Sequence, residues 1–198
     1  MFARLALSGL ALAVVSVAAP ASAQTWNIDP AHSSASFTVK HMMVSNVHGR
    51  FGKVEGTVVY DGKNLAAAQV DTTIDATTIT TDNEKRDAHL KSPDFFDAAG
   101  FPAITFKSKR VEAAGAGKFK LIGDLTMRGT TKEVVLDAEG PTAPVSAQGG
   151  QRIGVTATTT LNRHDYGVSW SRTMDGGGYV VGDDVKVTIE LELIKQTS

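Results

Sequence analysis

The stretch Asp184–Ile194 reads DVKVTIELELI and alternates between polar and apolar side chains along its whole length. Its apolar members stand at every second position: Val185, Val187, Ile189, Leu191 and Leu193. Successive side chains of a β-strand point to opposite faces, so a period of two predicts a strand with one face toward a core and the other toward solvent.

The same alternation recurs in seven earlier parts of the chain, residues 34–41, 51–60, 69–76, 104–108, 118–127, 132–139 and 151–161. Turn signals separate these parts, among them Asp61-Gly62 and Gly115-Ala116-Gly117. By contrast, residues 42–49, 141–150 and 162–182 lack the period of two, and we expect them to be irregular.

About eight strands with one apolar face each can bury that face in a closed barrel or in two packed sheets. The inward-facing set mixes small and medium residues with a few aromatic ones and includes Ala35, Gly56, Thr72 and Ala157. Such a set under-fills the interior, and a barrel of about eight strands has room for one small ligand. We therefore expect an all-β fold, an extended antiparallel β-barrel of about eight strands, with a packed sandwich as the alternative.

One segment, Asn83 to Phe96 (NEKRDAHLKSPDFF), suits a helix better than a strand. If Glu84 to Lys91 is helical, then Arg86, His89 and Leu90 share one face of the helix. A guanidinium can bind a diphosphate through two parallel hydrogen bonds, and an imidazole can donate to a carbonyl. We expect this one short helix to lie near the barrel mouth and to present these groups to a ligand.

Phe95 and Phe96 follow this helix, and we expect them to close the barrel entrance over a ligand. Two less specific interpretations stay open. Arg86 and Asp87 could form a structural ion pair, and the two phenylalanines could belong to a plug or to the core. His41 lies on the apolar face of its strand and is the best candidate for a polar group inside the cavity. The alternative is a buried histidine bonded to a backbone carbonyl.

The N-terminus predicts export. Arg4 is followed by an apolar run from Leu5 to Ala19 and by Ala21-Ser22-Ala23, the pattern of a secretory signal peptide with its cleavage site. We expect residues 1–23 to be the signal peptide and residues 24–198 to form a single domain. The formal net charge of −1 argues against a nucleic-acid partner, and the absence of cysteine excludes disulfides and an acyl anchor on a cysteine.

Catalytic and metal-binding motifs are missing from the sequence. There is no G-x-S-x-G elbow, no phosphate-binding P-loop and no G-x-G-x-x-G fingerprint. The five histidines show no short-interval pairing, although Asp29, His32 and His41 could converge in space. We expect no catalytic residues, no metal and no cofactor, and thus a protein that is not an enzyme.

Several runs resemble the YceI-like family: residues 29–33 (DPAHS), 37–41 (FTVKH), 86–96 (RDAHLKSPDFF), 123–132 (GDLTMRGTTK) and 163–167 (RHDYG). The resemblance covers the chain after the signal peptide, with Tyr166 standing where phenylalanine is frequent. It implies a lipocalin-like antiparallel barrel, exported in bacteria, that binds polyisoprenoid chains or similar amphiphiles in its interior.

We therefore expect a periplasmic or secreted protein that sequesters or carries a polyisoprenoid, of the isoprenoid quinone or polyprenyl phosphate type, or a similar long-chain amphiphile. The alternatives are a hydrolase or isomerase acting on such a lipid and a ligand-free structural or stress-related barrel. Transient contact with a membrane or a membrane protein is expected, and both a monomer and a homodimer stay open. The expected ligand-binding residues are Phe37, Val39, His41, Phe51, Arg86, His89, Leu90, Phe95, Phe96, Phe106, Leu125, Met127, Tyr166 and Trp170.

Overall fold

The computed structural model of the protein describes residues 23–147 and 149–196, so all but the last residue of the expected signal peptide lies outside the described part. The strands are β1 Gln24–Ile28, β2 Ser34–His41, β3 Ser45–Phe51, β4 Val54–Tyr60, β5 Gln69–Asp75, β6 Ile79–Thr80, β7 Ala103–Gly115, β8 Lys118–Met127, β9 Thr130–Glu139, β10 Val145–Ala147, β11 Gly150–Asn162 and β12 Val181–Lys195. The helices are η1 Leu65–Ala67, η2 Ala76–Thr78, α1 Glu84–Lys91 and η3 Arg163–Tyr166.

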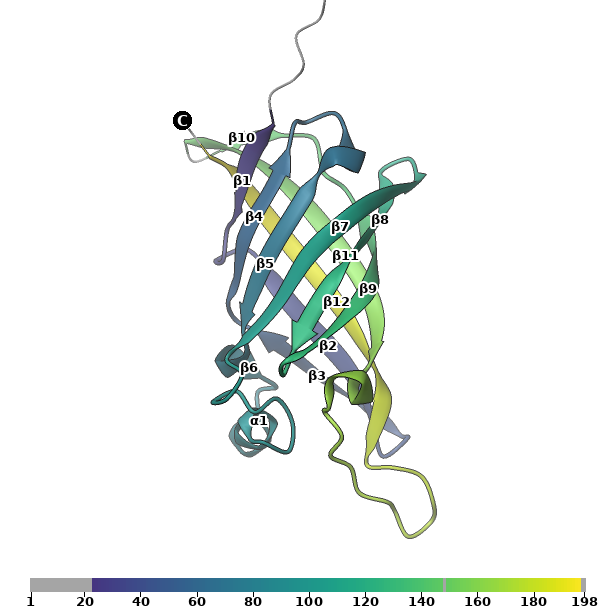
Figure 1. The fold of residues 1–198 in the computed structure, drawn as a ribbon. Helices are drawn as coiled ribbons and strands as arrows, with labels where there is room; N and C mark the ends of the chain where they lie inside the picture. The colour runs from purple at the N-terminus through teal and green to yellow at the C-terminus, as the bar shows by residue number, and fades with distance from the viewer. Residues whose placement is uncertain (1–22, 148, 197–198) are drawn as a thin grey trace, which may run out of the picture.

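Eight of the strands close into an antiparallel barrel. Each pairs with the next in the order β11-β9-β8-β7-β5-β4-β1-β12, and β12 pairs back onto β11 from Arg152↔Ile194 to Asn162↔Asp184. The all-β barrel predicted from the alternation is confirmed, and the sandwich alternative is wrong. Figure 1 shows the barrel standing upright, with α1 below its lower end.

The strands β1 and β2 share one edge of β12. β1 pairs with the C-terminal end of β12, and β2 pairs with its N-terminal part from Val181 to Glu190. The strand is interrupted between β1 and β2 at Pro30, because proline has no backbone N–H to donate to a β-ladder. The wall next to α1 is therefore extended by β2, β3 and β6 beyond the ring of eight strands (Figure 1).

Two segments expected to be irregular contain strands. Most of residues 42–49 belongs to a hairpin in which β3 pairs with β2 from Ala35↔Phe51 to His41↔Ser45. Residues 141–150 contain β10. The turn of the hairpin is made by Met42 and Met43, whose φ angles of 51° and 62° are left-handed. Most of β3 is exposed, so its sequence does not need apolar residues at every second position. The strand is held by its backbone hydrogen bonds to β2.

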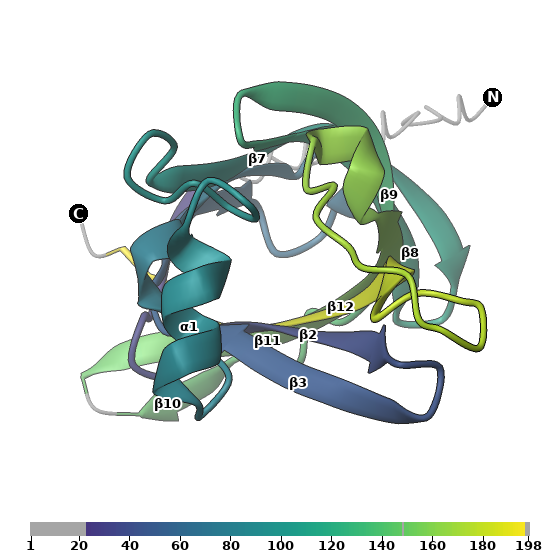
Figure 2. The same cartoon turned by 90° about the horizontal axis from the view of Figure 1, so that it is seen from below.

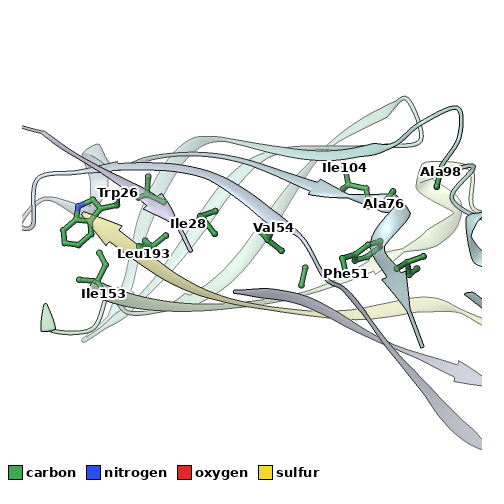
Figure 3. Close-up of a cluster of buried hydrophobic side chains, with 12 residues drawn as sticks. Trp26, Ile28, Phe51, Val54, Ala76, Ala98, Ile104, Ile153 and Leu193 are labelled. Carbon is green, nitrogen blue, oxygen red and sulfur yellow. The ribbon is translucent and has the colours of Figure 1, made fainter. Parts of the chain in front are cut away.

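The barrel end away from α1 is filled by packed side chains. Trp26, Ile28, Ile153 and Leu193 come together there, each at most 6% exposed (Figure 3). The indole of Trp26 also donates to the Tyr60 carbonyl at 3.3 Å. These side chains pack across the interior at this end, so we expect the opening for a ligand at the end that carries α1. None of the described helices is both long and apolar enough to cross a membrane.

Candidate functional site

The barrel encloses a cavity of about 600 Å³. Small-molecule sites typically measure about 300–1,000 Å³. The inward residues Val187, Ile189 and Leu191 line this cavity, and each stays only partly buried although it points into the barrel. Side chains from opposite walls therefore do not meet along the middle of the barrel. The surface that lines the space between them is almost wholly apolar.

All fourteen residues expected to bind the ligand line this cavity. They come from β2, β3, β7 and β8, from α1 and the turn after it, and from η3 and the loop that follows. Sequence reasoning missed other lining residues, of which the charged ones are Lys40, Lys85 and Arg163. The inward position of the apolar ones was visible in the strand alternation, whereas no sequence period marks the charged ones.

Thr81 and Asp87 position α1 at the mouth. The Asp87 carboxylate accepts from the backbone N–H of Thr81 at 2.8 Å and from the Thr80 hydroxyl at 2.9 Å. Burial raises the pKa of Asp87, but the hydrogen bonds from Thr81 and Thr80 outweigh it, so the net pKa is lowered. The helix begins with a cap, because the Asn83 side chain accepts from the backbone N–H of Arg86 at 3.0 Å.

The ion pair considered for Arg86 and Asp87 is not among the contacts of the described residues. Instead, both side chains bond to Thr81. Arg86 donates from Nε to the Thr81 hydroxyl at 2.7 Å and from Nη2 to its carbonyl at 2.9 Å. The guanidinium is thus held in one orientation on the cavity wall, with two of its nitrogens already occupied.

Aromatic rings form two groups at the mouth. The rings of His89, Phe95 and Trp170 contact one another with centroids 4.9–5.3 Å apart, and His89 also bonds to Asp94 at 2.8 Å. Phe96 instead packs edge-on against Phe51, with centroids 5.5 Å apart. Phe95 is 7% exposed and Phe96 is half-buried, so both belong to the packing at the mouth as well as to the cavity wall.

Arg163 organises the loop from η3 to β12. Its side chain is 5% exposed, and it donates to four backbone carbonyls and to the Asp183 carboxylate at 3.2 Å. The carbonyl partners and distances are Val168 2.7 Å, Trp170 2.9 Å, Gly182 2.9 Å and Val181 3.4 Å. Burial lowers the pKa of Arg163, an effect that Asp183 opposes. This single guanidinium therefore fixes the loop that carries Trp170.

Arg128 joins the two halves of the mouth. It donates to the carbonyls of Phe95 and Pro93, both at 2.7 Å, and to the carbonyl of Gly167 at 2.9 Å. The first two carbonyls belong to the turn after α1, and the third follows η3. The aromatic group of His89, Phe95 and Trp170 therefore rests on a hydrogen-bonded frame made by two arginines.

Tyr166 and His41 each place a polar ring group on the cavity wall that has no hydrogen-bond partner within the part of the chain that the structure describes. The Tyr166 side chain is buried, its hydroxyl has no partner, and burial raises the pKa of this phenol to about 12, so it stays neutral. The imidazole of His41 is half-buried at the mouth end of β2 and is not bonded to a backbone carbonyl.

Asp29, His32 and Glu192 are the described residues that could together hold a metal ion, with donor atoms within 4.8 Å of one another. Arg152 lies among them, 3.0 Å from the Asp29 carboxylate and bonded to Glu192. Because Arg152 and His32 already pair with these carboxylates, the group forms an ion-pair network. His41 does not join this group, because it lies at the opposite end of β2.

This network predicts acid sensitivity. The hydrogen bond from His32, followed by that from Arg152, lowers the pKa of Asp29 from 3.8 to about 2. The carboxylate therefore stabilises the fold above pH 3.8, and this contribution is lost as the pH falls toward 2. Asp29→Asn should lower the free energy of unfolding at pH 7 by about 1 kcal/mol or less. The free energy of unfolding of this variant should also decrease less than that of the wild type as the pH falls from 3.8 toward 2.

Urea unfolding at a series of pH values measures this effect. Asp137→Asn, which removes an exposed carboxylate from the outside of β9, is the matched control. An Asp29→Asn protein whose stability follows the wild-type acid profile would show that the network does not stabilise the fold.

Comparison with known proteins gives a family and relatives. A family model described as YceI-like domain matches residues 26–193. A UPF0312 protein of Vibrio cholerae is 38% identical over 184 residues, which are 92% of this chain and 94% of the relative. A UPF0312 protein of Staphylococcus aureus is 38% identical over 168 residues, 84% of this chain and 95% of the relative.

Solved structures share the barrel. BcnA of Burkholderia cenocepacia superposes with a TM-score of 0.71 at 25% identity, over 83% of this chain and 98% of that one. The YceI protein of Campylobacter jejuni superposes with a TM-score of 0.66 at 30% identity, over 80% and 90%. A polyisoprenoid binding domain from Saccharophagus degradans has a TM-score of 0.65 at 14% identity, over 87% and 99%, and shows the fold alone.

Proposed function

Because this chain belongs to the YceI-like family, we propose that it binds the hydrocarbon chain of a polyisoprenoid or a similar long-chain amphiphile inside its barrel. The single observation that carries the proposal is the unfilled apolar cavity of about 600 Å³. The solved neighbour described as a polyisoprenoid binding domain supports the ligand class through its fold. The fourteen predicted site residues are the proposed wall of the binding site.

The driving force is the burial of hydrocarbon. Each buried methylene group contributes about 0.8 kcal/mol, so about twenty of them give about 16 kcal/mol of gross stabilisation. Association costs about 4–15 kcal/mol, so a long chain can be retained whereas a short one cannot. The hydrocarbon tail thus supplies the affinity, and the polar groups at the mouth supply selectivity.

We infer binding rather than catalysis from the cavity wall. Of the described lining residues none is an aspartate or a glutamate, so paired carboxylates for acid–base work are missing there. The open cavity also speaks against a purely structural barrel, whose core would be filled.

We propose the periplasm as the site of action, because the N-terminus has the pattern of a secretory signal peptide. Residues 24–198 form the proposed mature protein, a single binding domain. A protein exported in this way can take up a lipid at a membrane surface and hold it away from water.

Organic extraction of the purified mature protein, followed by mass spectrometry, tests the function. We expect a co-purifying long-chain lipid, or uptake of one after incubation of the delipidated protein with geranylgeraniol or hexadecanol. A variant with a blocked cavity, Val187→Trp, should carry none and controls for lipid on the outer surface. A delipidated wild-type protein that takes up no long-chain lipid would contradict the proposal.

We propose that ligands enter and leave at a membrane. The β2–β3 turn exposes Met42, Met43 and Val44, which are 45%, 67% and 84% exposed. Beside it lies the loop before β12 with Tyr179, which is 53% exposed, and the backbone N–H of Met42 donates to the Val180 carbonyl of this loop at 2.9 Å. This apolar lip is continuous with the cavity wall through His41 and Val180, so a bilayer is the occupant that suits it.

Replacing Met43 and Val44 by serine should slow transfer of a fluorescent long-chain lipid from vesicles to the protein about tenfold, because both side chains would lose contact with the bilayer. Binding of the same lipid delivered in dilute solution should not change. Val145→Ser, which removes an apolar side chain 60% exposed in β10, is the control. Equal transfer rates for all three proteins would rule out the lip as the membrane contact.

A further inference from the structure

The charged residues on the cavity wall all have one sign. Those described are Lys40, Lys85, Arg86 and Arg163, and no described aspartate or glutamate lines the cavity. The whole chain is nearly balanced, with 20 basic and 21 acidic residues. The sign bias at the cavity is therefore a local feature and does not follow from the composition.

Within the described residues, three of these four cations have no carboxylate within 4.0 Å, and one of the three, Arg86, is bonded to Thr81. Arg163 donates to carbonyls of the loop from η3 to β12, here called the mouth loop, and to the Asp183 carboxylate. Arg86 donates to Thr81. Lys40 and Lys85, within the described part of the chain, have no carboxylate within 4.0 Å.

Among the described residues, three of the twelve lysines are paired with a carboxylate: Lys53, Lys109 and Lys118. Lys109 lies 2.6 Å from Asp124, and Lys118 lies 2.9 Å from Glu139. The lack of a carboxylate partner therefore does not by itself distinguish Lys40 and Lys85, whereas their place beside the cavity does.

Both lysines lie at the rim. Lys40 precedes the last residue of β2, and Lys85 lies in the first turn of α1. Figure 2 looks into this end of the barrel and shows α1 crossing one side of the opening, next to the hairpin that β2 and β3 form. An amphiphile whose tail fills the barrel would leave its polar end at this rim.

We propose that the cavity selects amphiphiles with an anionic polar end, a phosphate or a carboxylate, over neutral ones with the same hydrocarbon chain. The inference rests on the proposed function and names the head group of its ligand. Cations gathered at the opening of the cavity, with no carboxylate on its wall, give that opening a positive potential. An anionic oxygen gains charge-assisted hydrogen bonds from the ammonium groups, whereas an alcohol or a quinone gains little from them.

Matched ligand pairs test the selectivity. The delipidated mature protein is titrated with palmitate and hexadecanol, and with geranylgeranyl phosphate and geranylgeraniol, by displacement of an uncharged fluorescent lipid. We expect each anion to bind at least about tenfold more tightly than its alcohol at 50 mM NaCl, with a smaller ratio at 500 mM NaCl because salt screens exposed charges. The two pairs separate a carboxylate preference from a phosphate preference.

Two double variants locate the effect. Lys40→Gln with Lys85→Gln should bring the anion-to-alcohol ratio close to one while the affinity for the alcohols stays unchanged. Lys120→Gln with Lys132→Gln changes the net charge by the same amount on exposed positions of β8 and β9 and should keep the wild-type ratio.

The outcomes separate the two proposals. Equal binding of each acid and its alcohol by the wild-type protein would overturn the head-group inference and leave the lipid-binding function intact. A ratio that falls equally in both double variants would show a general charge effect and would also overturn it. Failure of all four ligands to bind would overturn the proposed function itself.

Discussion

Val187→Trp is expected to abolish binding of long-chain ligands while the barrel stays folded. Val187 lies in the middle of β12, opposite Phe37 of β2 and Thr159 of β11, and lines the cavity. Because it is only partly buried, the space in front of it is not filled by protein. An indole there would occupy the path of the hydrocarbon chain, so we expect a loss of affinity of more than about 100-fold, or about 2.8 kcal/mol.

The neighbouring residue of the same strand provides the control. Lys186 is exposed on the outer face of β12, so Lys186→Trp adds the same indole outside the barrel. It should bind as the wild type does. Thermal unfolding should show that Val187→Trp is at least as stable as the wild type, because an indole in the cavity gains apolar contacts.

Displacement of a fluorescent lipid gives the affinity of each variant. Wild-type affinity in a well-folded Val187→Trp protein would mean that the ligand does not run through the barrel. Loss of folding in that variant would mean that the space beside Val187 is smaller than the structure shows. In that case, Val39→Phe tests the same wall with a side chain smaller than an indole.

Arg163→Met is expected to destabilise the protein by about 3 kcal/mol, because it removes a buried cation and leaves its carbonyl partners without a donor. Those partners lie between Val168 and Gly182, so the loss should concentrate in the mouth loop. Urea unfolding measures the stability, and limited proteolysis within residues 171–180 measures the opening of the loop.

Arg172→Met is the matched control. Arg172 lies in the same loop, but its side chain is exposed, so its removal should change stability by no more than about 0.5 kcal/mol. Arg163→Lys keeps the positive charge without the planar fork and should lie between the two. An unfolding midpoint for Arg163→Met equal to that of the wild type would show that other contacts hold the mouth loop.

The sequence was most informative where structure depends on side-chain periodicity. The alternation in Asp184–Ile194 predicted β12, and the same pattern predicted most of the barrel wall, because the pleat of a strand sends neighbouring side chains to opposite faces. The composition of Asn83 to Phe96 predicted a helix from Glu84 to Lys91, and α1 has these bounds. These features depend on residues close together in the chain, so they can be read locally.

Prediction was poorer where partners are distant in sequence. The β3 strand was missed because it is held by its ladder to β2 and carries little apolar pattern. Adjacent charges suggested an ion pair of Arg86 with Asp87, but folding gave both side chains Thr81 as a partner. The role of Arg163 was invisible, because its partners belong to a loop without any periodicity.

By itself the sequence determined which side chains face inward and that these side chains are apolar, since both follow from local geometry and residue type. Whether the inward side chains meet or leave a cavity was decided only by the tertiary structure. The width of the interior depends on how many strands close the ring, and that is set by pairings between distant segments such as β11 with β12. The same long-range arrangement brought Lys40 and Lys85 to one opening, which no property of either segment alone could show.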